Sequence, residues 1–151
     1  GSGWFERDYV EYGYEFGTVG GRLDALAEAL PVIRGRWSQL NPAPTRDIPI
    51  LIGGGGEKKT LRIVAQHADI WHSFADVPTL ERKLGILAEH GADVGRDVSE
   101  VEISVELRER TMQQADELHA VGATLFTLGL DGPQFDMAPV REWLSWRDGH
   151  R

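Results

Sequence analysis

Four short apolar segments alternate along this chain with segments of helical periodicity, and this alternation constrains the fold more than any other feature. The apolar segments are residues 48–52, 70–74, 101–107 and 124–130, each bounded by turn-forming residues. Strands that alternate with helices pair in parallel, because each helix carries the chain back to the same end of the sheet. The sequence therefore predicts an α/β fold of about four parallel βα units.

The segments between these strands carry apolar stripes with helical spacing. They predict helices over residues 22–37, 58–67, 78–90 and 111–120, and a last helix after Asp136. Two residues predict irregularities. Pro31 should kink the first helix, because proline lacks the N–H that an α-helix needs, and Gly91 should end the third. Residues 1–21 are aromatic and glycine-rich without a clean period, and predict a long loop.

Composition limits the classes of partner. The 151 residues have a formal net charge of −8 and no stripe of basic residues, so we do not expect nucleic-acid binding. The absence of cysteine fits a reducing compartment, and neither a membrane span nor a signal sequence is recognisable. We expect a cytoplasmic protein that does not bind membranes. Because the chain opens with Gly-Ser-Gly and no methionine, we also expect a processed product or a piece of something longer.

A run of four glycines, Gly53–Gly56, separates the first strand from the following helix. Glycines let backbone N–H groups approach an anion closely, and the helix N-terminus adds a partial positive charge. The run matches neither the dinucleotide fingerprint nor the P-loop. It predicts an anion site. The alternative is a tight turn in which glycine only tolerates positive φ.

Three side chains near predicted strands are candidates for chemistry. His72 lies near the carboxyl end of its strand, where parallel barrels build active sites, and could act as acid or base or be only a hydrogen-bonded structural histidine. Its neighbour Trp71 could stack on a cofactor ring, although a core role is favoured. Glu106 ends the polar set of an alternating strand, which faces either a barrel lumen or solvent. Asp131, in Asp-Gly-Pro, is favoured as a turn residue.

Metal binding is not expected. The five histidines show neither H-E-x-x-H nor any other ligand spacing. A solvated surface position is the expectation for three of them, His90, His119 and His150.

Several of these segments occur in the order seen in a known family: residues 3–9 (GWFERDY), 22–30 (RLDALAEAL), 48–56 (IPILIGGGG), 68–71 (ADIW) and 124–129 (TLFTLG). In this order the chain resembles the luciferase-like monooxygenases, most closely their F420-dependent branch. The resemblance implies the C-terminal half of a (β/α)8 TIM-type barrel, with residues 1–151 forming a single partial barrel domain. It also implies that the phosphate of F420, or of FMN as the alternative, lies on Gly53–Gly56, where Lys58 or Lys59 could add positive charge. Gly3 and Trp4 would then lie near the cofactor ring.

The expected function is the cofactor-binding part of an oxidoreductase that moves hydride between F420 or FMN and a small organic substrate. A half-barrel leaves open sheet edges, so the expected partner is a second copy of the chain or a missing N-terminal half-barrel. The alternatives are a non-catalytic half-barrel that acts as a phosphate-binding or assembly module, and a structural or engineered object without native activity.

Overall fold

A four-stranded parallel sheet forms the centre of the computed structural model, which describes residues 1–130 and 132–150. The strands lie in the order β1-β2-β3-β4, and every neighbouring pair is parallel. Their bounds are β1 Leu51–Gly53, β2 Ile70–Ser73, β3 Glu102–Glu106 and β4 Leu125–Thr127. The predicted α/β fold with four parallel strands is therefore confirmed. Each strand is shorter than the apolar segment from which it was predicted.

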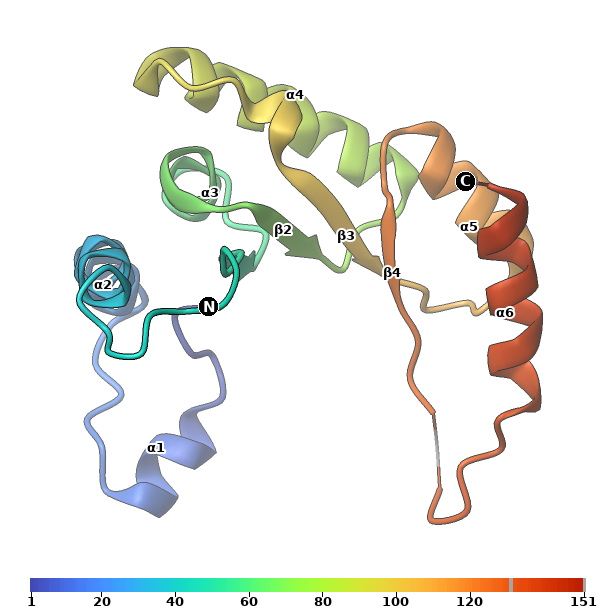
Figure 1. Ribbon diagram of the computed structural model, residues 1–151, viewed down its shortest axis with the longest axis horizontal. Coiled ribbons are helices and arrows are strands. Elements are labelled where there is room, and N and C mark those ends of the chain that lie inside the picture. Colours follow the sequence, from blue (N-terminus) through green and yellow to red (C-terminus); the bar gives the residue numbers. More distant parts are fainter. Residues whose placement is uncertain (131, 151) are drawn as a thin grey trace.

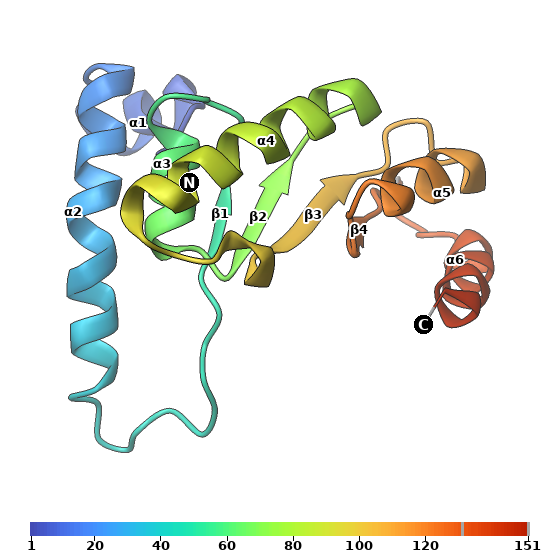
Figure 2. The ribbon, with the colours of Figure 1, turned by 90° about the horizontal axis from the view of Figure 1, so that it is seen from above.

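Helices cover one side of this sheet. Figures 1 and 2 show α3, α4 and α5 arranged around its outer side, with α2 beside α3 at the β1 end and α6 beyond β4. Each of α3, α4 and α5 connects two successive strands, which is the arrangement of part of a (β/α)8 barrel. The helices are α1 Glu6–Tyr12, α2 Val19–Trp37, α3 Thr60–His67, α4 Val77–Val94, the 3₁₀ turn η1 Val98–Glu100, α5 Met112–Ala120 and α6 Ala138–Gly149.

Strand register separates an apolar face, covered by helices, from an inner face that carries both polar and apolar side chains. Ile52, Trp71 and Ile103 occupy neighbouring register positions and are buried in the core beneath the helices. Since successive side chains of a strand alternate between faces, the next register row, which contains His72 and Ser104, faces the inner side of the sheet, the side without helices. The polar set of β3 therefore faces the position of a barrel lumen.

The sequence predicts that α4 ends at Gly91, but the helix continues to Val94. Its left-handed cap is Gly95, at φ +67°. Gly91 is buried against the turn that follows the helix: a Cβ atom there would lie 2.7 Å from Cγ1 of Val98 and 3.0 Å from the carbonyl oxygen of Arg96. The glycine is needed for close packing rather than for helix termination.

The N-terminal region also differs from the prediction. A long loop over residues 1–21 is wrong for Glu6–Tyr12, which form α1, ended by Gly13 at φ +73°, and for residues 19–21, which begin α2. The packing of the Tyr9 ring edge-on against Phe16, with centroids 5.0 Å apart, folds the following chain back onto this short helix. Helix α2 runs through Pro31 without interruption.

Within the described residues, no helix combines the length and the apolar character that a membrane crossing requires.

Candidate functional site

The glycine run leaves the carboxyl end of β1 and reaches the N-terminus of α3 through a turn at residues 57–59. Gly54 has φ +127°, a conformation that only glycine adopts without strain. Its N–H donates to the carbonyl oxygen of His72, at 3.1 Å, and the carbonyl oxygen of Gly56 accepts from the N–H of Leu61, at 3.0 Å. The run is thus fixed at both of its ends.

The backbone N–H groups of residues 55–59, which lie between the N–H of Gly54 and the N–H of Leu61, are free for a ligand. Among the hydrogen bonds within residues 1–130 and 132–150, none is donated by the backbone N–H of residues 55–59. Helix α3 has no side-chain N-cap either, because its N-cap residue is Lys59. Successive N–H groups at a helix N-terminus form a favourable environment for an anion. The turn therefore has the donors that a phosphate group requires.

Helix α4 lies against this turn and contributes a cation. The Nζ atom of Lys83 occupies the space where a Cβ of Gly55 would fall. Arg82 forms an ion pair with Glu57, and Nε2 of His90 lies 2.8 Å from the carbonyl oxygen of Glu57. These contacts hold the turn and bring one ammonium group to its glycines.

Lys83 was missed by the sequence analysis. The sequence did contain a signal, since residue 83 falls within the helical stripe of Leu80 and Leu87, both buried. A lysine in an apolar stripe directs its charge past the core toward a neighbouring element. In this structure that element is the glycine turn.

The two lysines that the sequence analysis favoured lie differently. Nζ of Lys59 is 2.7 Å from Oδ1 of Asp24 on α2, in an ion pair whose side chains are 51% and 62% exposed. Lys58 is exposed on the turn. Of the three lysines, Lys83 has the closest recorded approach to the glycines.

Trp71 has a structural position. Its side chain is 0% exposed, within the core between sheet and helices, and its Nε1–H donates to the carbonyl oxygen of Gly54 at 2.8 Å. A ring enclosed in this way does not stack on a ligand. Of the two roles considered for Trp71, stacking on a cofactor ring is therefore wrong, and the residue is part of the core. The physical reason is the alternation of β2, which points Trp71 toward the helices and His72 toward the inner side.

The N-terminal segment lies beside the same turn. A Cβ at Gly1 would be 3.5 Å from the carbonyl oxygen of Gly53. Gly3, at φ +73°, accepts a hydrogen bond from Nε of Arg22 at 2.8 Å. The ring of Trp4 is 82% exposed. The structure thus brings the start of the chain to the end of β1 and leaves one aromatic ring uncovered there.

His72 and Glu106 are on the inner side of adjacent strands. Nδ1 of His72 lies 2.8 Å from Oγ of Ser104, its register partner. Burial lowers the pKa of His72 below its usual 6.5, and the Glu106 carboxylate acts in the opposite direction. Glu106 itself is 4.0 Å from the guanidinium of Arg108. These groups form a polar row toward the carboxyl ends of β2 and β3.

A cavity of about 220 Å³ opens at these carboxyl ends. Glu106 and Arg108 line it, together with Phe74, whose ring lies 5.2 Å from the His72 ring and 5.4 Å from the Arg108 guanidinium. An aromatic surface beside an ion pair can hold a small polar organic molecule. Asp131, expected in a turn after the last strand, lies outside the described residues.

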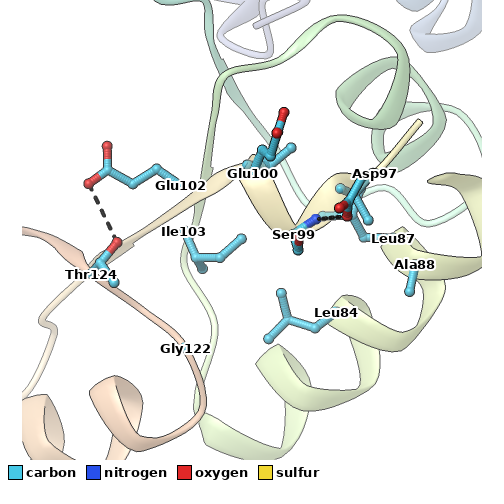
Figure 3. A pocket seen from close by; sticks show the side chains of 12 residues that line it. Leu84, Leu87, Ala88, Asp97, Ser99, Glu100, Glu102, Ile103, Gly122 and Thr124 are labelled. Atoms are coloured by element: carbon cyan, nitrogen blue, oxygen red, sulfur yellow. Dashed lines mark hydrogen bonds between the residues drawn. The ribbon is translucent and has the colours of Figure 1, made fainter.

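A larger cavity, of about 480 Å³, lies at the opposite ends of the strands (Figure 3). Leu84, Leu87 and Ile103 form apolar walls. On its rim, Thr124 Oγ1 donates to Glu102 at 3.4 Å and the Ser99 N–H donates to Asp97 at 2.9 Å. Because parallel barrels build active sites at the carboxyl ends of their strands, we do not assign the reaction to this cavity.

Three of the remaining histidines, His90, His119 and His150, have structural contacts. His90 is half-buried against the turn, and His119 is half-buried beside Trp146, at 6.2 Å between ring centroids. A solvated position is therefore wrong for these two. His150 is exposed and stacks on Trp146 at 4.4 Å. Within the described part of the chain, no three histidine or acidic side chains are grouped to hold a metal ion.

Comparison with known proteins identifies the family. The family model described as luciferase-like monooxygenase matches residues 1–128, so the chain belongs to this family. No curated protein matches it.

Among solved structures, an F420-dependent secondary alcohol dehydrogenase in complex with an F420-acetone adduct is 15% identical, with a TM-score of 0.55 over 89% of this chain. A coenzyme F420-dependent tetrahydromethanopterin reductase from Methanopyrus kandleri is 21% identical over 40% of this chain, with a TM-score of 0.37. This chain spans 55% of the length of the dehydrogenase and 17% of that of the reductase. The dehydrogenase likeness shows the shared fold.

Proposed function

We propose that this chain is the cofactor-binding part of a luciferase-like oxidoreductase that uses F420, with FMN as the alternative cofactor. The phosphate of the cofactor binds at Gly53–Gly56, and the reaction takes place on the inner side of the sheet. Family membership and the F420-dependent relatives support the class of cofactor. The observation that carries the proposal is the turn itself, where the backbone N–H groups of residues 55–59 donate no hydrogen bond within the described chain.

The residues of the turn fit a phosphate in charge as well as in hydrogen bonding. Lys83 supplies a positive charge beside Gly55, and the N-terminus of α3 adds its partial charge. Gly3 and Trp4, near the end of β1, are the part of the chain proposed to lie near the cofactor ring. Lys58 and Lys59 act at longer range, because one is exposed and the other pairs with Asp24.

The bound cofactor supplies the hydride chemistry, so the chain's task is to hold and orient the reactants. His72 and Glu106 are the proposed catalytic residues, since both face the inner side at the carboxyl ends of β2 and β3. The cavity beside Phe74 and Arg108 receives a small organic substrate. The cytoplasmic location expected from composition stays a prediction.

Fluorescence titration of the chain with F420 and, separately, with FMN tests this function. We expect saturable binding of F420 and weaker binding of FMN. No binding of either cofactor at tens of micromolar would refute the proposal for this chain. Competition by inorganic phosphate in the same titration reports on the phosphate end of the site, because phosphate displaces the cofactor only if the two share it.

A charge placed in the turn tests the position of the phosphate. Gly54→Asp introduces a carboxylate that repels an anion, but any side chain at φ +127° also strains the backbone. Gly54→Asn is the matched control, because asparagine has nearly the same shape without the charge. We expect the aspartate variant to bind F420 more weakly than the asparagine variant. Equal affinities would place the phosphate elsewhere.

A second candidate function, a non-catalytic phosphate-binding or assembly module, is favoured by the edges of the sheet. β1 and β4 are edge strands, and the large apolar side chains of Leu51 and Phe74 are 49% and 56% exposed. Such edges and apolar surface pair readily with another chain. The proposed partner is a second copy or a complementary half-barrel. Light scattering at micromolar concentration tests self-association, and a stable monomer would contradict the second-copy alternative.

A further inference from the structure

A buried serine contacts the proposed catalytic histidine from the neighbouring strand. Ser104 is 0% exposed, and its Oγ lies 2.8 Å from Nδ1 of His72. The two residues are register partners in β2 and β3, so the parallel ladder fixes their separation. Within the described residues this is the only hydrogen bond of the Ser104 hydroxyl.

Because the Ser104 hydroxyl has no other partner among the described residues, the direction of its hydrogen bond with His72 can be inferred. A serine hydroxyl carries one hydrogen, and a buried donor without an acceptor is costly. If Nδ1 carried the proton and donated to Oγ, the hydroxyl hydrogen would have no acceptor in this site. If the hydroxyl donates to Nδ1 instead, both groups are satisfied. The neutral ring of His72 therefore carries its proton on Nε2.

The Nε2 atom is the part of the ring left for a ligand. It makes no hydrogen bond with residues 1–130 or 132–150. The ring is on the inner side of the sheet, beside Phe74, whose ring lies edge-on at 5.2 Å. Glu106 is the charged group that acts on the ring, and Arg108 lies 4.0 Å from that carboxylate. The histidine thus presents an N–H donor, rather than a lone pair, toward the proposed reaction site.

We propose that Ser104 is a positioning residue that holds neutral His72 as its Nε2–H form, so that His72 acts as a hydrogen-bond donor to a substrate oxygen and not as a general base. This inference rests on the proposed function, and it gives His72 a specific role in it. An N–H aimed at an oxygen that gains negative charge, such as a carbonyl oxygen when its carbon accepts hydride, stabilises the transition state. His72 keeps its proton in this role: the bound reduced cofactor would supply the hydride to the carbonyl carbon, the C=O electron pair would move to the oxygen beside Nε2–H, and solvent water would protonate that oxygen.

Protonation of His72 weakens this arrangement. Nδ1–H would then donate to Oγ, and the buried hydroxyl hydrogen of Ser104 would lose its acceptor. The serine thus favours the neutral ring, in the same direction as burial, which lowers the pKa of His72.

Nitrogen-15 NMR of the histidine side chains tests the inference without cofactor or substrate. In the wild-type chain above pH 7 we expect His72 as one tautomer, with the proton on Nε2. In Ser104→Ala we expect a mixture of tautomers and a titration midpoint about one pH unit higher, because the loss of one hydrogen bond to the neutral ring corresponds to roughly that shift. Ser104→Thr, which keeps the hydroxyl, should restore the wild-type tautomer.

Ser73→Ala is the matched control. Ser73 is 2% exposed and lies in β2 beside His72, but its side chain is on the other face of the strand. It should leave the tautomer and the titration of His72 unchanged, which separates the effect of the hydroxyl from that of a small buried cavity. A wild-type proton on Nδ1, or an unaltered tautomer in Ser104→Ala, would overturn the inference.

The two proposals fail in different experiments. If the chain binds neither F420 nor FMN, the proposed function fails while the NMR result still reports on Ser104. If the cofactor binds and the tautomer is wrong, only the role given to His72 fails. In an active assembly, Ser104→Ala should lower kcat about 10-fold, which corresponds to the loss of about 1.4 kcal/mol of transition-state stabilisation, and leave KM nearly unchanged. Ser104→Thr should recover most of that activity.

Discussion

Replacing Lys83 with methionine isolates the charge that the structure brings to the glycine turn. Methionine keeps a flexible apolar side chain of similar length on α4 but removes the ammonium group beside Gly55. Within the described residues Lys83 has no ion pair or hydrogen bond, so its loss leaves no partner unpaired. We therefore expect the free energy of unfolding without ligand to change by less than about 0.5 kcal/mol.

The effect on binding should be much larger. A hydrogen bond to a charged group contributes about 1.5–3 kcal/mol, so the Kd for F420 should rise roughly 10- to 150-fold in Lys83→Met. Lys83 as a residue is half-buried and its Nζ atom lies beside Gly55, so solvent screens this charge less than that of an exposed lysine. The lower end of the range applies if the phosphate is bound mainly by the backbone N–H groups.

Fluorescence titration at two salt concentrations measures this effect, with Lys58→Met and Lys59→Met as controls. Both controls remove one positive charge near the same turn, but Lys58 is exposed and Lys59 pairs with Asp24. Each should weaken binding less than threefold, because exposed charges contribute little. The reasoning is refuted if Lys83→Met binds F420 as the wild type does, or if an exposed control loses as much affinity.

Three further predictions concern stability, all measured by urea unfolding. Trp71→Phe leaves the Gly54 carbonyl without its 2.8 Å donor and should cost about 1–3 kcal/mol; an unchanged midpoint would contradict the role of this bond. Gly91→Ala should cost about 1–3 kcal/mol through overpacking, whereas Gly85→Ala, with nothing within 4 Å, should stabilise α4 by about 0.5–1 kcal/mol. Because burial lowers the pKa of His72, the unfolded chain binds more protons near pH 6.5, and stability should fall as pH decreases through that value. His72→Gln should reduce this slope.

The strands, the outer helices and the glycine turn could be predicted from sequence because their signals are local. An apolar run of five residues, or a stripe repeating every three to four residues, depends on near neighbours along the chain. The family resemblance then placed these elements in a barrel. The same local reasoning gave a wrong end for α4, because the buried contact of Gly91 with Val98 involves chain that has already turned back on the helix.

The lysine at the site could not be assigned in this way. Lys58 and Lys59 follow the glycines directly, and proximity in sequence favoured them. Lys83 is 28 residues from Gly55 and reaches it only because α4 packs along α3 over the sheet. The position of the Lys59 ammonium group likewise depends on Asp24 of α2, with which it forms an ion pair. Such contacts are tertiary, so the sequence shows at most that residue 83 carries a charge within an apolar stripe.

Trp71 and His72 are consecutive residues that connect the glycine turn to the inner side of the sheet. Both of them contact Gly54: the Trp71 indole donates to its carbonyl oxygen, and the His72 carbonyl oxygen accepts from its N–H. Strand alternation then points the indole into the core and the imidazole toward Ser104. A displacement of β2 would therefore move the glycine turn and the imidazole together. This coupling gives Trp71 a structural role next to the proposed catalytic histidine: its indole holds Gly54, and with it the proposed phosphate site, at a fixed distance from His72.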